Sequence, residues 1–394
     1  MAKLKKVALL LPRYPHLDRL ENIIDLIEKQ GGWQLYLHSE SNREPALPQL
    51  VEWGCSGIIL YPENPTVVAA ARRAQVPTVV LEPPPEMRRG LLQKLPWDYG
   101  FADNASIADA AADYFLDRQY RSFAFVDEVD RCYWSEERWV RFSRRIGDAG
   151  FPCERYPAVP KRMQGDWPSE EIRMIGWLQR LPKPVAVFAS WDKRARQVLE
   201  ACLTADIAVP QSVAVLGVDN DPTVCKTTMP ALSSIPFESN FEVVIKILNA
   251  RMSGKKFDRV VWKTQAAPVA TRLSTDFVAA EDPVVARALR YIRYATATSA
   301  ISVGDVVAHV KCSRRLLEKR LRAATGRTPL EEIHRSRLER VCGLLATSKM
   351  RIGEIAAACG FENRAGLDVL FRRTFGTTMR DWRAQNRKDI APGR

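Results

Sequence analysis

Short apolar runs alternate with amphipathic stretches over the first two thirds of the chain. Helical periodicity lies at 17–30, 65–74, 104–117 and 194–205. Strand and helix in repeated succession are typical of parallel sheets covered on both faces. Two such sheets with a cleft between them fit this length, and ligands bind at the carboxyl ends of their strands. The predicted strands are 6–11, 34–37, 57–60, 78–81, 122–126, 186–189 and 214–218.

The pattern changes after residue 276. Strand-like runs end, and 283–383 predicts helices joined by short turns, with Pro283 at a first helical position. Two segments, at about 302–324 and 352–375, share one plan: a helix, a tight turn and a second helix with surface arginines. The predicted fold is therefore a two-lobed α/β domain, 1–276, followed by an all-α domain, 277–394, with two helix-turn-helix motifs.

The net charge of +13 belongs entirely to the helical end. Residues 283–394 hold 23 Lys and Arg against 10 Asp and Glu, so the preceding part is neutral. A basic domain joined to a neutral body indicates a polyanionic partner at one end of the chain. A solvated basic surface is the alternative.

The first helix-turn-helix carries a polar stripe on its second helix. Ser313 is suited to cap that helix, and helical spacing puts Leu317 and Leu321 on its inner face. Arginine and lysine donate to guanine and glutamate accepts from cytosine, so such a stripe fits the major groove. An ordinary amphipathic surface helix would show the same pattern. The candidate DNA-binding residues are Arg314, Arg315, Glu318, Lys319 and Arg322.

The second helix-turn-helix follows the same plan. Gly360 is suited to the left-handed turn, and the next helix, 363–375, begins after it. Its inner face is expected to hold Leu367, Leu370, Phe371 and Phe375. Its candidate DNA-binding residues are Arg364, Ala365, Asp368 and Val369.

The residues around this second motif resemble the AraC family of regulators over 283–388. The resemblance rests on Gly360-Phe361, Leu367, Phe371-Arg372-Arg373, Phe375-Gly376 and Trp382-Arg383. It implies that the two recognition helices enter successive major-groove faces on one side of double-stranded DNA. It also implies base contacts from Arg315, Glu318 and Lys319, and from Arg364, Ala365 and Val369.

Two positions depart from that family pattern. Val369 stands where the family often has a basic residue, so the second helix is expected to read a thymine methyl group and to be the weaker reader. Met379 replaces the usual proline of a turn. Whether the second helix reads bases or mainly holds the backbone stays open.

The neutral body resembles the periplasmic-binding-protein fold of LacI-type sugar sensors. The order of sensor and reader is that of the xylose operon regulators, and the resemblance covers essentially the whole chain. It implies D-xylose or a similar pentose as effector, no cofactor, and activation of sugar-catabolism genes. The local resemblance lies in Glu137-Arg138, Trp191-Asp192-Lys193-Arg194-Ala195-Arg196, Val215-Leu216-Gly217-Val218-Asp219-Asn220 and Leu232-Ser233-Ser234.

Candidate sugar-binding residues lie where such a fold binds ligands. Asp219 closes an apolar strand, and Arg138 matches the sugar-binding arginine of that fold. Carboxylates accept from sugar hydroxyls, arginine donates to them, and aromatic rings cover the C–H face. Asp219 could instead cap a turn, Arg138 could form a surface ion pair, and Asp192 could be an N-cap. The candidates are Arg138, Asp192, Asp219, Asn220, Trp134, Trp191, Phe237, Arg13 and Glu82.

The remaining patterns bound the function. Only four histidines occur, in no Ser/His/Asp or H-E-x-x-H arrangement, and the eight cysteines form no C-x-x-C pair, so neither an enzyme nor a metal site is expected. We find no signal peptide and no membrane span, and expect a cytoplasmic homodimer that contacts RNA polymerase. Asp103-Asn104 and 234–237 are expected to cross between the lobes. A repressor, or a regulator of another effector, stays open.

Overall fold

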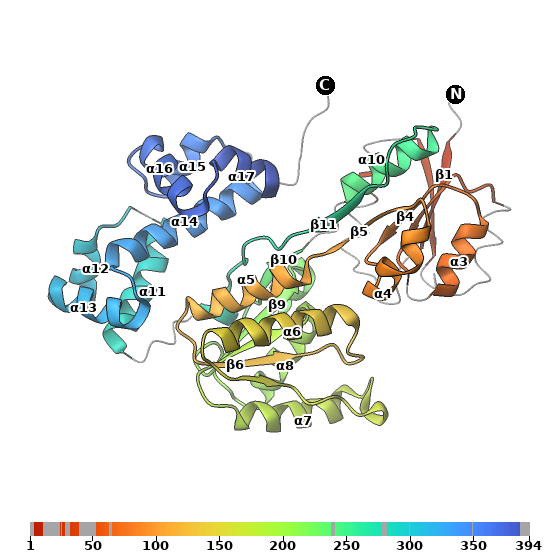
Figure 1. The fold of residues 1–394 in the computed structure, drawn as a ribbon. Coiled ribbons are helices and arrows are strands. Elements are labelled where there is room, and N and C mark those ends of the chain that lie inside the picture. The colour runs from red at the N-terminus through yellow and green to blue at the C-terminus, as the bar shows by residue number, and fades with distance from the viewer. Residues whose placement is uncertain are drawn as a thin grey trace. The chain divides into compact units, whose positions relative to one another are not determined.

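The computed structural model describes residues 4–10, 24, 26–27, 32–38, 53–62, 65–237, 241–276, 282–298, 300–348 and 350–386 (Figure 1). The chain forms two compact units. It passes between them after Asn104 and after Pro236, as predicted, and again after Gln265. The first unit comprises Met1–Asn104, Cys132–Trp134 and Phe237–Gln265, and the second comprises Ala105–Arg131, Ser135–Pro236 and Ala266–Arg394.

Six parallel strands form the sheet of the first unit, in the order β11-β5-β4-β3-β1-β2. Its strands are β1 (Lys5–Leu10), β2 (Trp33–His38), β3 (Gly57–Leu60), β4 (Thr78–Leu81), β5 (Asp98–Ala102) and β11 (Val261–Thr264). Its helices are α3 (Pro65–Arg73), α4 (Pro85–Arg89) and α10 (Phe241–Met252), with a 3₁₀ turn at Leu91–Lys94. The predicted helix at 17–30 lies largely outside the described residues.

The pattern analysis missed β5 and β11 because neither is a continuous apolar run. Asp98 and Gly100 interrupt β5, and β11 alternates half-buried and exposed residues. Gly100 has no Cβ, which leaves room for the indole of Trp262 on the neighbouring strand β11. β5 and β11 therefore form one edge of the sheet although their paired residues are 162 positions apart in sequence, and tertiary packing brings them together.

Five parallel strands form the sheet of the second unit, in the order β10-β9-β8-β6-β7. The strands are β6 (Ser122–Val126), β7 (Cys153–Arg155), β8 (Val185–Ala189), β9 (Val213–Asp219) and β10 (Ser233–Pro236). The helices are α5 (Asn104–Leu116), α6 (Tyr133–Asp148), α7 (Trp167–Arg180), α8 (Asp192–Thr204) and α9 (Pro222–Thr227), with 3₁₀ turns at Lys161–Met163 and Leu273–Thr275. The short strands β7 and β10 had not been predicted.

The described residues of the second unit from 282 to 386 are mostly helical, and we call this part of the chain the reader domain. Two buried clusters form its core, one around each helix-turn-helix. The helix α14 lies between the two motifs in sequence, and α15 and α17 both pack against it (Figure 1). The helices are α11 (Pro283–Thr298), α12 (Val303–Val310), α13 (Arg314–Thr325), α14 (Pro329–Thr347), α15 (Ile352–Ala358), α16 (Arg364–Phe375) and α17 (Met379–Asn386).

Helices capable of spanning a bilayer are absent from the described part of the chain.

Candidate ligand edge and nucleic-acid interface

The strands β6, β8 and β9 are parallel neighbours, so their carboxyl ends lie on one edge of the second sheet. We define the ligand edge as Arg138, Ser190, Asp219 and Asn220. Ser190 follows β8, Asp219 ends β9, and Asn220 comes directly after it. Arg138 joins them from α6. The edge therefore collects donors and acceptors of the type that a polyhydroxyl ligand needs.

Arg138 is buried rather than on the surface. Its side chain is 5% exposed, and Nη1 donates to the backbone carbonyl of Ser190 at the end of β8. A surface ion pair, the alternative for this residue, does not fit such burial. The buried guanidinium keeps its charge, because arginine does not lose its proton in proteins, so it is a strong donor at the ligand edge.

Asp219 and Asn220 form a backbone turn that is costly for side chains with a Cβ. Both have positive φ, +104° and +56°, in the left-handed region that glycine favours. The amide of Asn220 donates to Ser234 Oγ at 2.9 Å, and Asn220 Oδ1 accepts from Arg272 Nη2 at 2.7 Å. Strain of this kind persists only where surrounding contacts hold it, and it is common at functional sites. Capping of α9 is performed by Asp221, not by Asp219.

Asp192 has protein partners for both carboxyl oxygens. Oδ1 accepts from Ser234 Oγ at 2.6 Å, and Oδ2 accepts from the amide of Asp221 at 2.8 Å. Its side chain is 1% exposed, and burial, followed by the charge of Asp219, raises the pKa of Asp192 well above its usual value. The expected N-cap role is wrong, because Trp191 occupies the N-cap of α8. Direct contact of Asp192 with a ligand stays a prediction; its observed contacts hold the Asp219–Asn220 turn.

The other sugar-binding candidates divide between the units. Trp191 is buried in the second unit, with Lys193 Nζ 5.0 Å from its ring centre. Trp134 and Phe237 belong to the first unit, and Phe237 is buried. Glu82, also in the first unit, accepts the amide of Ala102 at Oε2 over 3.1 Å, and its φ of +51° is again left-handed. Arg13 lies outside the described residues.

Asp127 stands at the carboxyl end of an apolar strand, which is the criterion that selected Asp219, but the sequence analysis did not predict a role for it. Asp127 follows the apolar strand β6 and is buried. Its carboxylate accepts from Arg155 Nε at 2.6 Å and Ser135 Oγ at 2.9 Å. Its carbonyl accepts from Arg194 Nε at 2.8 Å, and Arg194 forms a buried ion pair with Glu170. These contacts fix the end of β6 and the start of α6, which carries Arg138.

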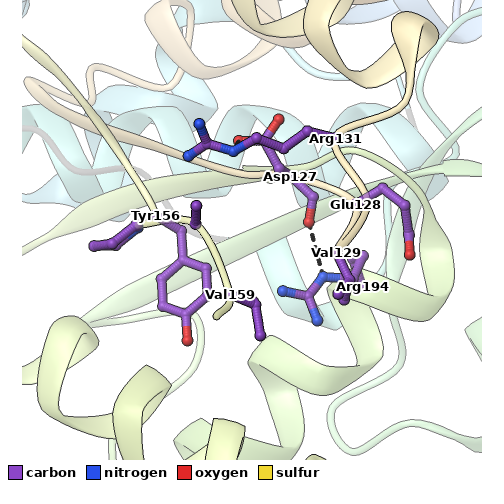
Figure 2. A pocket seen from close by; sticks show the side chains of 9 residues that line it. Asp127, Glu128, Val129, Arg131, Tyr156, Val159 and Arg194 are labelled. Carbon is purple, nitrogen blue, oxygen red and sulfur yellow. Dashed lines mark hydrogen bonds and ion pairs between the residues drawn. The ribbon is translucent and has the colours of Figure 1, made fainter. Parts of the chain in front are cut away.

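A small pocket lies beside this charged group (Figure 2). It has room for about one ordered water molecule and not for a sugar. Two buried polar atoms that line it, Glu128 Oε2 and Tyr156 Oη, have no hydrogen-bond partner in the described structure. Burial raises the pKa of Glu128. We therefore distinguish this pocket from the ligand edge.

The first helix-turn-helix agrees with the predicted geometry. Lys311 has a left-handed φ of +54° at the turn, and Ser313 Oγ accepts the amide of Leu316 at 3.3 Å to cap α13. Leu317 and Leu321 are fully buried, as expected. The opposite face is open: four of the five candidates are exposed and Glu318 is half-buried, paired with Arg314 over 2.9 Å. The exposed candidates are Arg314, Arg315, Lys319 and Arg322.

The second helix-turn-helix repeats this arrangement with one correction. Gly360 has the predicted left-handed φ, +72°, and Leu367 and Phe371 are fully buried. Phe375, expected to face inward, is 40% exposed: it is the last residue of α16 and contacts the buried Phe371 with tilted rings whose centres lie 4.5 Å apart. Met379 is buried in the second core, where it starts α17.

The outer face of α16 is less basic than that of α13. Arg364 and Ala365 are exposed, and Arg364 pairs with the half-buried Asp368 over 3.3 Å. Val369 is 70% exposed, so an apolar side chain stands in the middle of the predicted DNA-binding face. This composition favours apolar contact with a thymine methyl group over donation to guanine.

Comparison with known protein families agrees with both halves of the chain. Residues 112–275 match a family described as a periplasmic binding protein-like domain. Residues 306–385 match a family described as a helix-turn-helix domain.

Two curated relatives match nearly the whole chain. The xylose operon regulatory protein of Haemophilus influenzae is 28% identical over 387 residues, covering 96% of this chain and 98% of that protein. The xylose operon regulatory protein of Escherichia coli K12 is 25% identical over 362 residues, covering 91% of this chain and 90% of that protein. A solved structure of the xylose-binding transcription activator xylR has the same fold, with a TM-score of 0.58, 24% identity and coverage of 98% of this chain and 99% of that one. The chain thus resembles the xylose operon regulatory proteins over nearly its whole length, and it joins a periplasmic binding protein-like domain to a helix-turn-helix domain.

Proposed function

We propose that this protein activates pentose-catabolism genes in response to D-xylose or a similar pentose bound at the ligand edge. The observation that carries the proposal is one chain that holds both an edge with the buried Arg138 and the half-buried Asp219 and two helix-turn-helix motifs whose second helices expose arginines. The names of the relatives support the xylose assignment. No cofactor has a part in this proposal.

At the ligand edge, Arg138 donates to a sugar hydroxyl and Asp219 accepts from a neighbouring one. Asp192 acts indirectly, through Ser234, by holding the turn that presents Asp219. The buried aromatic ring of Trp191, in the same unit, supplies apolar surface for the C–H face of the sugar. Because this ring makes the surroundings less polar, the response to several pentoses is part of the test.

At the DNA, Arg315 and Lys319 donate to guanine, and α16 contacts a thymine methyl group through Val369. Two chains form a homodimer that places its reader domains on adjacent half-sites and contacts RNA polymerase. The sugar shifts the chain toward the DNA-competent state, and it must favour that state by a few kcal/mol, which corresponds to roughly a hundredfold in affinity.

The test begins with enrichment of random duplexes on the full-length protein. Fluorescence anisotropy then gives the duplex affinity with and without a panel of pentoses and hexoses. We expect one preferred duplex and a rise in affinity with D-xylose or a related pentose. No preference over competitor DNA refutes DNA reading, and an affinity indifferent to every sugar refutes the sugar switch.

Transcription in vitro with RNA polymerase then gives the sign of regulation. More transcript on addition of sugar supports an activator. Less transcript with the protein bound supports the repressor alternative and refutes activation.

A further inference from the structure

Residues 272–276, which precede the reader domain in sequence, are hydrogen-bonded to strands of the second sheet. Ser274 and Thr275 are fully buried, shortly before α11 begins at Pro283. Ser274 Oγ accepts the amide of Ser233 at 2.8 Å and donates to the carbonyl of Val215 at 2.7 Å. Thr275 Oγ1 lies 2.6 Å from Tyr114 Oη on α5. A displacement of β10 is therefore also a displacement of this segment.

Arg272, two residues earlier, joins this segment to the ligand edge. Its amide donates to Ser233 Oγ at 2.7 Å, and its Nη1 donates to the carbonyl of Leu232 at 2.8 Å. Its Nη2 donates to Asn220 Oδ1 at 2.7 Å. One planar guanidinium thus contacts both the start of β10 and the strained turn of the ligand edge. Lysine carries a single ammonium and does not reproduce this fork.

The strained turn has two supports of different kinds. Ser234, on β10, accepts the backbone amide of Asn220 at 2.9 Å, and Asp192, at the start of α8, holds Ser234 in place through their 2.6 Å hydrogen bond. Arg272 holds it from the segment that continues into the reader domain. Any change in the conformation of Asn220, which belongs to the ligand edge, moves the acceptor of Arg272 directly.

We propose that Arg272 is a positioning residue that couples the ligand edge to the reader domain through its hydrogen bond with Asn220. The inference rests on the proposed function and assigns the coupling to one side chain that belongs neither to the ligand edge nor to the second helix of either helix-turn-helix motif. It predicts that weakening this bond lowers the effect of sugar on DNA affinity more than it lowers either binding alone. Coupling of this kind is reciprocal, so it is measurable from both ligands.

The test compares full-length wild type, Arg272→Lys and Asn220→Ala. Titration calorimetry gives the D-xylose affinity, anisotropy gives the duplex affinity with and without D-xylose, and thermal unfolding reports the fold. Allosteric ratios are commonly about 5- to 150-fold, and we expect both variants to lower the wild-type ratio by about fivefold or to unity. Asn220→Ala leaves the bonds of Arg272 to Leu232 and Ser233 intact. Because Asn220 also belongs to the ligand edge, its ratio is taken at D-xylose concentrations that calorimetry shows to be saturating for that variant, so that a lower ratio reports lost coupling and not lost sugar binding.

Two further variants separate positioning from general destabilisation. Arg272→Lys combined with Asn220→Asp offers a carboxylate to the ammonium group, and we expect it to recover part of the ratio. Arg259→Lys is the matched control, because Arg259 donates to the carbonyl of Leu92 and to Gln93 Oε1 in the other unit. We expect it to keep the wild-type ratio.

The outcomes are distinct for the two proposals. A wild type whose DNA affinity ignores every sugar refutes the proposed function, and this inference with it. A responsive wild type with unchanged ratios in Arg272→Lys and Asn220→Ala overturns this inference alone. An equal loss in Arg259→Lys overturns it as well, because the effect would then not depend on the ligand edge.

Discussion

Replacing Gly217 with alanine places a methyl group where β9 faces α8. The new Cβ would overlap Asp192 Oδ1 and lie 3.2 Å from the Cβ of Ala195. Since β9 and α8 are both packed in the core of the second unit, the carboxyl of Asp192 must move. Its hydrogen bonds to Ser234 and to the amide of Asp221 are then lost.

The magnitude follows from these two hydrogen bonds. A buried polar group left without its partner costs about 1–3 kcal/mol, so we expect Gly217→Ala to destabilise the second unit by about 2–6 kcal/mol. Domains of this kind are stable by only about 5–15 kcal/mol, so the change is large. Urea unfolding followed by tryptophan fluorescence measures it, because Trp191 lies beside Asp192 and reports on this region.

The matched control is Gly176→Ala, in the middle of α7 of the same unit. Its added Cβ would meet only Arg180 Nη1, at an ordinary 3.6 Å. Alanine is the better helix former, so this variant should stabilise by up to about 1 kcal/mol. An unfolding midpoint of Gly217→Ala equal to that of wild type or of the control would refute the contact between Gly217 and Asp192.

Four other predictions test the reader domain and the ligand edge. Arg315→Ala should leave the thermal unfolding midpoint unchanged, because the side chain is exposed and makes no hydrogen bond or ion pair within the described structure. It should cost about 1–3 kcal/mol of duplex affinity at one base position. An equal loss of affinity on all sequences would show a phosphate contact instead. Phe371→Ala should cost about 3–5 kcal/mol in thermal unfolding, and Phe375→Ala clearly less, since only Phe371 is fully buried. Asp219→Ala should abolish the sugar response in anisotropy and keep basal DNA binding, and a persisting response would contradict the ligand edge. Because the pKa of Asp192 is raised, the folded chain holds the proton of this carboxyl to a higher pH than the unfolded chain does; the resulting stabilisation is present below the unfolded pKa of about 3.8 and is lost as pH rises through the folded pKa. The free energy of unfolding of wild type minus that of Asp192→Asn should therefore fall with rising pH. A difference that stays constant with pH would exclude this titration.

Features set by a single element could be predicted from sequence. The buried strands show as apolar runs, and the inner faces of α13 and α16 show as leucines and phenylalanines at helical spacing. The reason is local: a strand or helix that buries one face repeats its apolar residues with its own period. Arg138 was predicted from a family resemblance and not from periodicity, because its hydrogen bond is to Ser190 after β8, outside its own helix α6.

Features that join distant elements were decided by tertiary structure. β5 and β11 pair with Trp262 packed where Gly100 leaves room, and Phe371 is fully buried whereas Phe375, one turn later on α16, is 40% exposed. The hydrogen bond between Arg272 and Asn220 spans 52 positions. A single sequence carries no periodic trace of such a pair, since each partner is an ordinary polar residue of its own segment. Only the packing of β9, β10 and the segment after them makes the two side chains neighbours.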